Sequence, residues 1–140
     1  MAGAKPHDFP GFTFSVCQLR PESRGSVHIT TPDTLLAPSM KANYLSTELD
    51  RRCAIESIRF ARKLSQTPAM ADYTETELKP GLQHASDADL LNFCRDSGAT
   101  IFHPSGTCKM GVDAMAVVDA RLRVHGLQGL RVVDCSAMPT

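Results

Sequence analysis

The chain has 140 residues, of which 42% are hydrophobic and 21% charged, the proportions of an ordinary globular protein rather than a disordered or fibrous one. Its 15 lysines and arginines balance 15 acidic residues, so it lacks the positive excess that favours nucleic acid or an anionic membrane. No apolar run reaches the roughly 20 residues of a transmembrane helix, and the N-terminus has no apolar signal core. The sequence therefore indicates neither a cellular compartment nor an oligomeric state.

The five cysteines are widely spread and contain no Cys-x-x-Cys pair. An odd number of separated cysteines argues against a disulfide framework or a zinc ribbon. It favours reduced, mostly structural thiols in a reducing compartment. The residues are Cys17, Cys53, Cys94, Cys108 and Cys135.

In chain order, residues 1–10 are rich in proline and poor in apolar side chains, and we expect a loop or a cut end there. Residues 12–17 alternate between apolar and polar side chains, which predicts a half-buried strand. Turn residues at 20–25 then precede a second alternating run, 26–30. We expect the two runs to pair as an antiparallel hairpin.

The clearest helix follows an irregular segment, residues 35–49. Asp50 is a candidate N-cap, and apolar residues recur at three- and four-residue spacing from Ala54 to Leu64. Pro68 marks a position after the end of this helix.

A second helix is predicted after a polar connector at 69–85. The sequence Ser86-Asp87-Ala88-Asp89 is a capping box with aspartate in the fourth place, and apolar residues follow it. This helix should end by Gly98. Residues 99–102 are expected to be extended.

Three β-rich runs, at 116–119, 122–126 and 130–134, are separated by glycines and leave no room for a helix. They predict short strands. The chain stops just after the last run and a Ser-Ala-Met-Pro turn, and we therefore expect a fragment truncated at both ends.

The most informative stretch is Phe-His-Pro-Ser-Gly-Thr-Cys-Lys-Met-Gly, from Phe102 to Gly111. Pro104 disfavours helical backbone at the preceding residue, so His103 should lie on extended or turning backbone. The proline fixes its own φ, and Gly106 permits a tight turn or a close backbone approach. The backbone of this stretch should therefore restrict the positions that the His103 imidazole can take.

Several interpretations of these residues compete. A lone histidine before proline is more often a turn residue than a base. A zinc site is an alternative, although the spacing matches no compact zinc knuckle. A Cys108–His103 nucleophile pair is another, although no orienting partner is in view. Asp134 is either a turn-capping carboxylate or a cofactor-side group at the carboxyl end of a strand. The zinc ligands would come from Cys94, His103, Cys108 and Cys135.

Four motifs occur here in a characteristic order: His-Pro-x-Gly-Thr-Cys-Lys-Met-Gly, Val-Val-Asp, Leu-Arg-Val-x-Gly and Leu-Arg-Val-Val-Asp-x-Ser-x-Met-Pro. Together they resemble the C-terminal region of the glucose–methanol–choline (GMC) oxidoreductases, most closely the choline dehydrogenase and alcohol dehydrogenase branch. Upstream, residues 19–27, residues 43–46 and Asp50 also resemble the family's substrate domain. The resemblance covers residues 11–140.

The resemblance implies an α+β fold. Residues 11–101 would form part of a substrate domain, an antiparallel sheet with flanking helices. Residues 102–140 would carry the catalytic-histidine motif and strands that return to complete an FAD-binding Rossmann-type domain. The family's Gly-x-Gly-x-x-Gly nucleotide loop is absent from this sequence.

The resemblance also implies a reaction: a small alcohol loses its hydroxyl proton to His103 and its carbinol hydride to the flavin N5, leaving an aldehyde or ketone. Asp134, Cys135 and Ser136 would lie along FAD, and no metal is involved. The family's second active-site histidine or asparagine lies beyond Thr140. We therefore expect a fragment of an FAD-dependent alcohol oxidoreductase that is inactive alone; the alternative is a non-catalytic binding or scaffold module that retains the motif. The sequence identifies neither the alcohol nor the electron acceptor.

Overall fold

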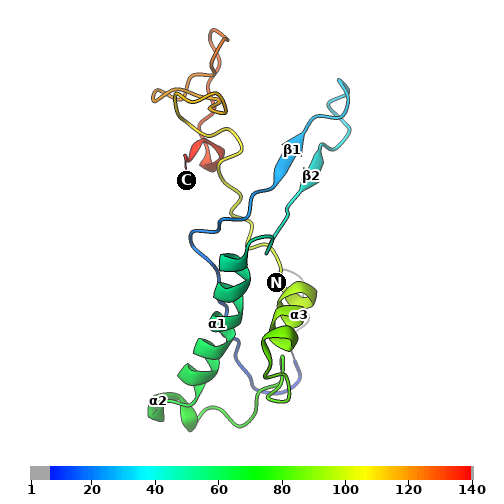
Figure 1. Ribbon diagram of the computed structural model, residues 1–140, viewed down its shortest axis with the longest axis vertical. Coiled ribbons are helices and arrows are strands. Elements are labelled where there is room, and N and C mark those ends of the chain that lie inside the picture. Colours follow the sequence, from blue (N-terminus) through cyan, green and yellow to red (C-terminus); the bar gives the residue numbers. More distant parts are fainter. Residues whose placement is uncertain (1–6, 140) are drawn as a thin grey trace. The chain divides into compact units, whose positions relative to one another are not determined.

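The computed structural model describes residues 7–139 (Figure 1), so residues 1–6 of the predicted N-terminal loop and Thr140 lie outside the described residues. The chain divides into two compact units. One comprises the described residues up to Leu19 together with Arg51–Asp96, and the other Arg20–Asp50 together with the residues from Ser97 onward. Each unit is therefore assembled from two separated segments of the chain.

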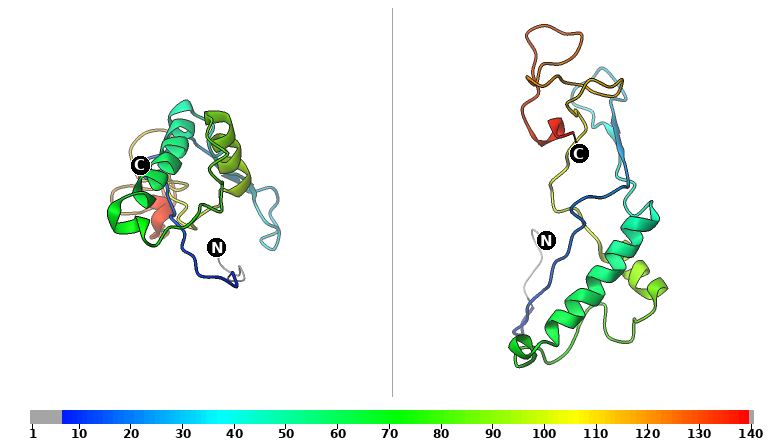
Figure 2. Two further views of the ribbon diagram at one scale, coloured as in Figure 1. Left: turned by 90° about the horizontal axis from the view of Figure 1, so that it is seen from below. Right: turned by 60° about the vertical axis from the view of Figure 1, so that its left-hand side comes forward.

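Helices dominate the first unit. Helix α1 spans Glu48–Ser65, α2 is a single turn at Pro68–Ala71, and α3 spans Asp87–Ser97. Helices α1 and α3 lie side by side in Figures 1 and 2. This arrangement confirms both predicted helices, the end of the first before Pro68 and the end of the second before Gly98. None of the helices in the described part of the chain is both long and apolar enough to cross a bilayer.

The core of the first unit lies between these two helices. Ile55 and Ile58 of α1 are buried against Leu90 of α3, whose side chain is 0% exposed. Three half-buried residues of α3 pack around this centre: Leu91, Phe93 and Cys94. The apolar spacing that predicted each helix is thus the spacing that buries one face of each.

The predicted capping box begins α3. The Ser86 hydroxyl oxygen accepts the Asp89 backbone N–H at 3.2 Å, and the hydroxyl donates to the Asp89 carboxylate at 2.7 Å. The bond from Ser86 lowers the pKa of Asp89. An ionised aspartate near a helix N-terminus is also favoured by the helix dipole.

The prediction that Asp50 caps α1 is wrong. The helix begins at Glu48, and Thr47 Oγ1 accepts the Asp50 backbone N–H at 3.3 Å, which is the contact of a capping residue. The buried Asp50 carboxylate accepts the backbone N–H groups of Glu22 at 3.0 Å and Ser23 at 2.8 Å. Asp50 therefore fastens the turn before β1 to the start of the helix.

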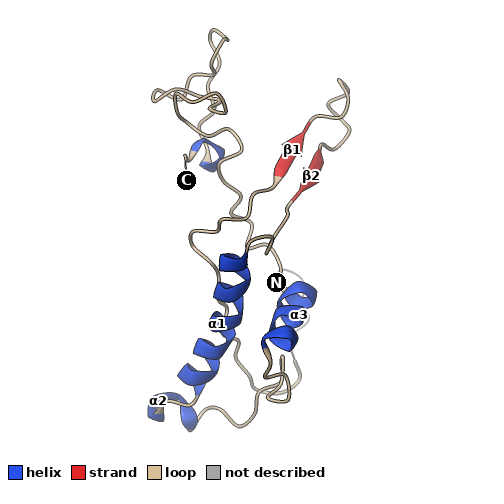
Figure 3. Cartoon of the chain, viewed as in Figure 1, coloured by secondary structure: helices blue, strands red, loops and turns tan. Residues whose placement is uncertain are grey.

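The prediction for the first hairpin is right for the strand within 26–30 and wrong for its partner. Strand β1 (Ser26–His28) pairs antiparallel with β2 (Ser39–Lys41), with Val27 opposite Met40 (Figures 1 and 3). Residues 12–17, the predicted partner of β1, form no strand, whereas the segment predicted to be irregular contains β2. Alternation identified neither burial nor pairing here, because Phe12 and Val16 are exposed and only Phe14 is half-buried.

Gly25 explains part of this pairing. A Cβ atom at residue 25 would lie 2.2 Å from the Lys41 carbonyl oxygen and 2.8 Å from that of Ala42, closer than atoms can approach. Only glycine lets the backbone after β2 come this close to the residue before β1.

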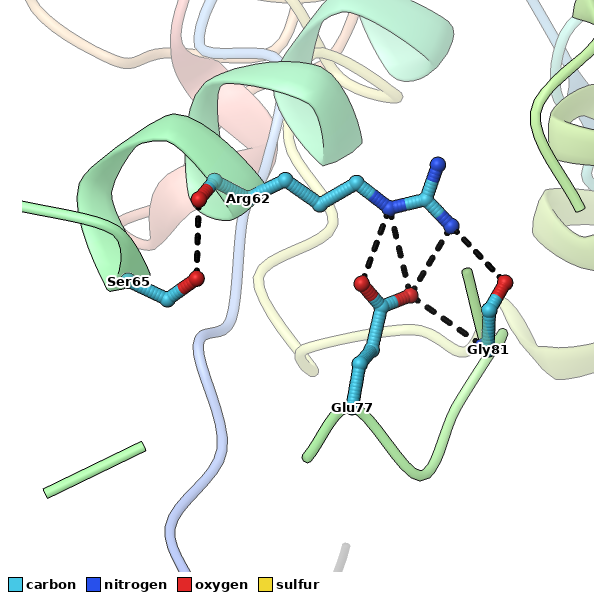
Figure 4. A network of polar contacts seen from close by, with 4 residues as sticks. All are labelled: Arg62, Ser65, Glu77 and Gly81. Atoms are coloured by element: carbon cyan, nitrogen blue, oxygen red, sulfur yellow. Dashed lines mark hydrogen bonds and ion pairs between the residues drawn. The ribbon is translucent and has the colours of Figure 1, made fainter. Parts of the chain in front are cut away.

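A polar network orders the predicted connector. Arg62 of α1 donates from Nε to Glu77 Oε2 at 2.9 Å and from Nη2 to Glu77 Oε1 at 2.9 Å. The same Nη2 donates to the Gly81 carbonyl at 3.0 Å, while the Gly81 N–H donates to Glu77 at 3.1 Å (Figure 4). Paired donors on a planar guanidinium hold a carboxylate in one orientation. The loop between α2 and α3 is thereby attached to α1.

The three β-rich runs near the C-terminus form only isolated bridges, so the predicted short strands are not present as strands in the described residues (Figure 3). Val118 is 0% exposed and takes part in two of the three bridges, which makes it the centre of this region. The bridges join Met110 to Val118, Val118 to Val124 and Arg123 to Arg131.

Candidate functional site

His103 lies in a loop of the second unit, where its side chain is exposed. Its backbone is not helical, as Pro104 predicted. The preceding residue, Phe102, has φ of +61°, a left-handed conformation that bulky residues rarely adopt. Its backbone N–H donates to Thr100 Oγ1 at 3.0 Å. The chain thus turns sharply just before the imidazole.

The two halves of the sequence motif are hydrogen-bonded to each other. A short 3₁₀ helix, η1 (Cys135–Ala137), presents its three carbonyl groups to the segment that follows His103. The backbone N–H groups of Gly106, Cys108 and Met110 donate to the carbonyls of Cys135, Ser136 and Ala137 at 3.3, 2.9 and 2.9 Å, respectively. The sequence did not predict this ladder of three hydrogen bonds. The bonds hold the backbone on the C-terminal side of His103 in place.

Asp134 is the N-cap of η1. Its backbone is extended, and its Oδ1 accepts the Ser136 backbone N–H at 2.8 Å. Hydrogen bonding from the side chain of Ser136 and then from its backbone N–H lowers the pKa of the Asp134 carboxyl, so the group is ionised at neutral pH. Asp134 thus caps the turn at η1, and this contact does not decide whether the carboxylate also faces a cofactor. Asp134 and Cys135 are exposed and Ser136 is half-buried.

The ladder brings Cys135 and Ser136 against the segment after His103, whereas Asp134 takes no part in it. Across the described residues, no hydrogen bond joins His103 to Asp134, Cys135 or Ser136.

The described cysteines do not assemble the alternative metal site. No group of three or more His, Cys, Asp or Glu residues within 7–139 is placed to hold a metal ion. Each of the five cysteines is a free thiol. Burial among the core residues of α3 raises the pKa of Cys94 and keeps that thiol protonated. A protonated thiol is neither a good ligand nor a nucleophile.

Asp119, the last residue of the Val-Val-Asp motif, organises the loop that follows it. Its Oδ1 accepts the backbone N–H groups of Arg121 at 2.8 Å and Arg123 at 3.0 Å. Its Oδ2 accepts from Arg123 Nε at 2.7 Å. The side-chain bond to Arg123 is the largest of the causes that lower the Asp119 pKa to about 2. In the sequence, the only signal for this ion pair is the four-residue spacing between Asp119 and Arg123.

This depressed pKa predicts a pH dependence. A carboxyl that is more acidic when folded stabilises the native loop above its unfolded pKa of about 3.9, and the contribution disappears as the pH falls from about 4 to about 2. In Arg123→Ala, a carbon-13 NMR titration should find the Asp119 midpoint raised from about 2 toward, but still below, 3.8, because the backbone donors remain. Arg131→Ala is the control, since Arg131 donates to the Arg121 carbonyl and not to Asp119. An unchanged midpoint in Arg123→Ala would contradict this assignment.

The residues at η1 suit one part of the flavin nucleotide that the resemblance implies. The Asp134 carboxylate is exposed, so it can accept from a hydroxyl group. A pyrophosphate, by contrast, is normally held by a glycine-rich loop at a helix N-terminus. Helices α1 and α3 begin after Thr47 and Ser86, with no such loop. Within residues 7–139, η1 thus offers an acceptor for a hydroxyl group of FAD, and neither α1 nor α3 begins with a glycine-rich phosphate loop.

Comparison with known proteins relates these features to characterised sequences. The family described as GMC oxidoreductase matches residues 21–140. An oxygen-dependent choline dehydrogenase from Klebsiella pneumoniae is 46% identical over 129 residues, covering 92% of this chain and 23% of that protein. Its counterpart from Pseudomonas aeruginosa is 44% identical over 137 residues, covering 98% of this chain and 24% of that protein. The chain spans about a quarter of the length of these relatives.

Solved structures show the same fold. Pyridoxine 4-oxidase from Mesorbium loti superposes with a TM-score of 0.78 at 40% identity, over 85% of this chain and 23% of that one. A formate oxidase superposes with a TM-score of 0.76 at 32% identity, over 86% of this chain and 21% of that one.

Proposed function

Because the chain belongs to the GMC oxidoreductase family, we propose that it supplies the base-bearing, C-terminal part of an FAD-dependent oxidoreductase that acts on CH–OH groups. The observation that carries this proposal is the ladder between the segment after His103 and η1. The ladder joins the segment that follows the proposed base to the residues proposed to lie along the cofactor. The choline dehydrogenases at 44–46% identity support the same reaction class.

On this proposal His103 is the general base. A neutral imidazole accepts the hydroxyl proton of the alcohol, and its exposed position lets a substrate oxygen approach within hydrogen-bond distance. The rigid backbone on both sides limits the directions in which the ring can point. When bound, FAD supplies the acceptor for the carbinol hydride at its N5 atom. Asp134, Cys135 and Ser136 would lie along the cofactor, with the Asp134 carboxylate accepting from a hydroxyl group rather than meeting a phosphate.

The domain assignment follows from the same proposal. Residues 11–101 would contribute to the substrate domain and residues 102–140 would return to the FAD-binding domain. The isolated bridges around Val118 would then be the short contacts from which strands extend once neighbouring strands are present. Strand pairing of this kind depends on long-range partners.

A primary alcohol is the proposed substrate class, and choline is the first compound to test because it is named for the relatives. In the longer oxidoreductase that contains residues 1–140, anaerobic addition of choline or of a panel of primary alcohols should bleach the flavin absorbance. A flavin that stays oxidised with every alcohol would overturn the proposal.

The isolated 140-residue chain is expected to leave FAD fluorescence unquenched at micromolar protein, because the described residues provide no phosphate-binding loop. Quenching that saturates with a defined stoichiometry would instead indicate a self-sufficient binding module. The same titration with the longer oxidoreductase is the positive control.

A further inference from the structure

We propose that Gly106 is a positioning residue for His103, because its conformation directs the hydrogen bond that holds the histidine loop, residues 99–105, to η1. This inference rests on the proposed role of His103 as the base. The Gly106 N–H donates to the Cys135 carbonyl at 3.3 Å, and the Gly106 backbone is left-handed, with φ of +79°. Gly106 therefore lies where the histidine loop meets the ladder.

The histidine loop has no other attachment of this kind. All of its residues are exposed, and in the described chain its one hydrogen bond runs within the loop, from the Phe102 N–H to Thr100. Pro104 fixes its own φ and restricts the backbone of His103. The Gly106 N–H is therefore the first group after the imidazole that is held by another part of the chain.

The φ angle of Gly106 decides where this N–H points. The chain beyond its Cα is held, since the Gly106 carbonyl accepts the Lys109 N–H at 3.2 Å and the Cys108 N–H donates to η1 at 2.9 Å. A rotation from +79° to about −65° would turn the N–H by about 145°, away from the Cys135 carbonyl, and would swing the histidine loop with it. A counter-rotation at Ser105 would restore the path of the chain but not the direction of the N–H, because the peptide group is planar.

Glycine is needed at this position for its conformation and not for its size. A Cβ atom at residue 106 would lie 3.5 Å from the Met138 carbonyl oxygen, which is an ordinary van der Waals contact. At positive φ, however, the Cβ of an L-residue crowds its own backbone, whereas glycine adopts this conformation freely and asparagine tolerates it. Alanine would therefore fit the space and still favour the rotation that breaks the hydrogen bond to Cys135.

Loss of this hydrogen bond would act on the chemical step. A general base must reach the proton that it removes within about 2.6–3.2 Å. A misplacement of about 1 Å at a reacting group costs on the order of 10²-fold in rate. Gly106 thus keeps the imidazole within reach of the alcohol oxygen without touching the substrate.

The test compares two substitutions in the longer oxidoreductase, with rates expressed per bound flavin. Gly106→Ala should lower kcat by about 10- to 100-fold, with KM changed by less than about threefold. Gly106→Asn introduces a larger side chain that tolerates positive φ, and its kcat should stay within about fivefold of wild type. Wild-type kcat in Gly106→Ala would overturn the inference, and so would an asparagine variant as slow as the alanine variant or slower.

Gly129→Ala is a matched control. Gly129 has φ of +75°, and apart from its chain neighbours no described atom lies within 4 Å of a Cβ at this position. The substitution should lower the melting temperature about as much as Gly106→Ala does and leave kcat and KM unchanged. An equal loss of kcat in both alanine variants would overturn the positioning role, as would a loss of flavin confined to Gly106→Ala.

A double variant separates this inference from the proposed function. If Gly106 acts through His103, then Gly106→Ala should lower kcat no further in a His103→Ala background. An equal further loss in that background would overturn the positioning role while leaving His103 as the base. If His103→Ala alone keeps normal turnover, the proposed function fails, independently of Gly106.

Discussion

Replacing His103 by alanine in the longer oxidoreductase is expected to lower kcat by about 10²–10⁴-fold, the usual contribution of a general base. This corresponds to about 3–5 kcal/mol of the activation barrier. The fold should survive, because the imidazole is exposed and neither donates nor accepts a hydrogen bond within the described residues. Flavin content and melting temperature should therefore remain close to those of wild type.

His84→Ala is the control for this substitution. His84 is also exposed, and its only hydrogen bond in the described structure is from its backbone N–H to the Gly81 carbonyl at 3.0 Å, which alanine retains. Its kcat should be that of wild type. A His103 variant that binds flavin and turns over at a near-normal rate would show that another group removes the proton.

Leu90→Ala is expected to destabilise the protein by about 2–5 kcal/mol. Leu90 is completely buried between the two helices of the first unit, where it contacts the cluster of Ile55 and Ile58. Truncation removes the transfer free energy of the lost carbons and leaves a cavity that two rigid helices cannot close. The change should appear as a lower urea midpoint with an unchanged slope.

Leu82→Ala tests whether this loss comes from burial. Leu82 is 63% exposed, so its truncation should change the free energy of unfolding by less than about 0.5 kcal/mol. Equal effects of the two substitutions would contradict the assignment of the α1–α3 interface as the core of this unit.

The local features of the fold were predictable from the sequence, and the long-range ones were not. Helix α3 was predictable because its signals are local: the capping residues Ser86 and Asp89 and the apolar residues after them lie within two helical turns. Strand β1 was found, but its partner was not, because pairing with β2 depends on a close approach at Gly25. Asp50 was misassigned as a cap for the same reason: its partners, Glu22 and Ser23, are distant in sequence.

In the candidate site, too, the features that depend on neighbouring residues were predictable and those that depend on the folded conformation were not. Pro104 constrains its neighbour, so the loop backbone of His103 was predictable. Whether Asp134 caps a turn depends on the conformation of η1, which has no signature in the local sequence. The left-handed conformation of Phe102 had no sequence signal, because it arises at a residue type that rarely adopts it.

The division of both units into separated segments has a consequence for synthesis on the ribosome. Arg20–Asp50 emerges early, yet the residues that complete its unit begin at Ser97 and continue to the end of the described chain. The β1–β2 hairpin must wait through the translation of the whole α1–α3 segment before its unit can close. Two-stranded hairpins are marginal in water, and contacts between distant segments form late in folding. Val27, Ile29 and Leu36 are exposed even in the completed unit, so the hairpin presents apolar surface throughout synthesis, the kind of surface that chaperones protect from aggregation.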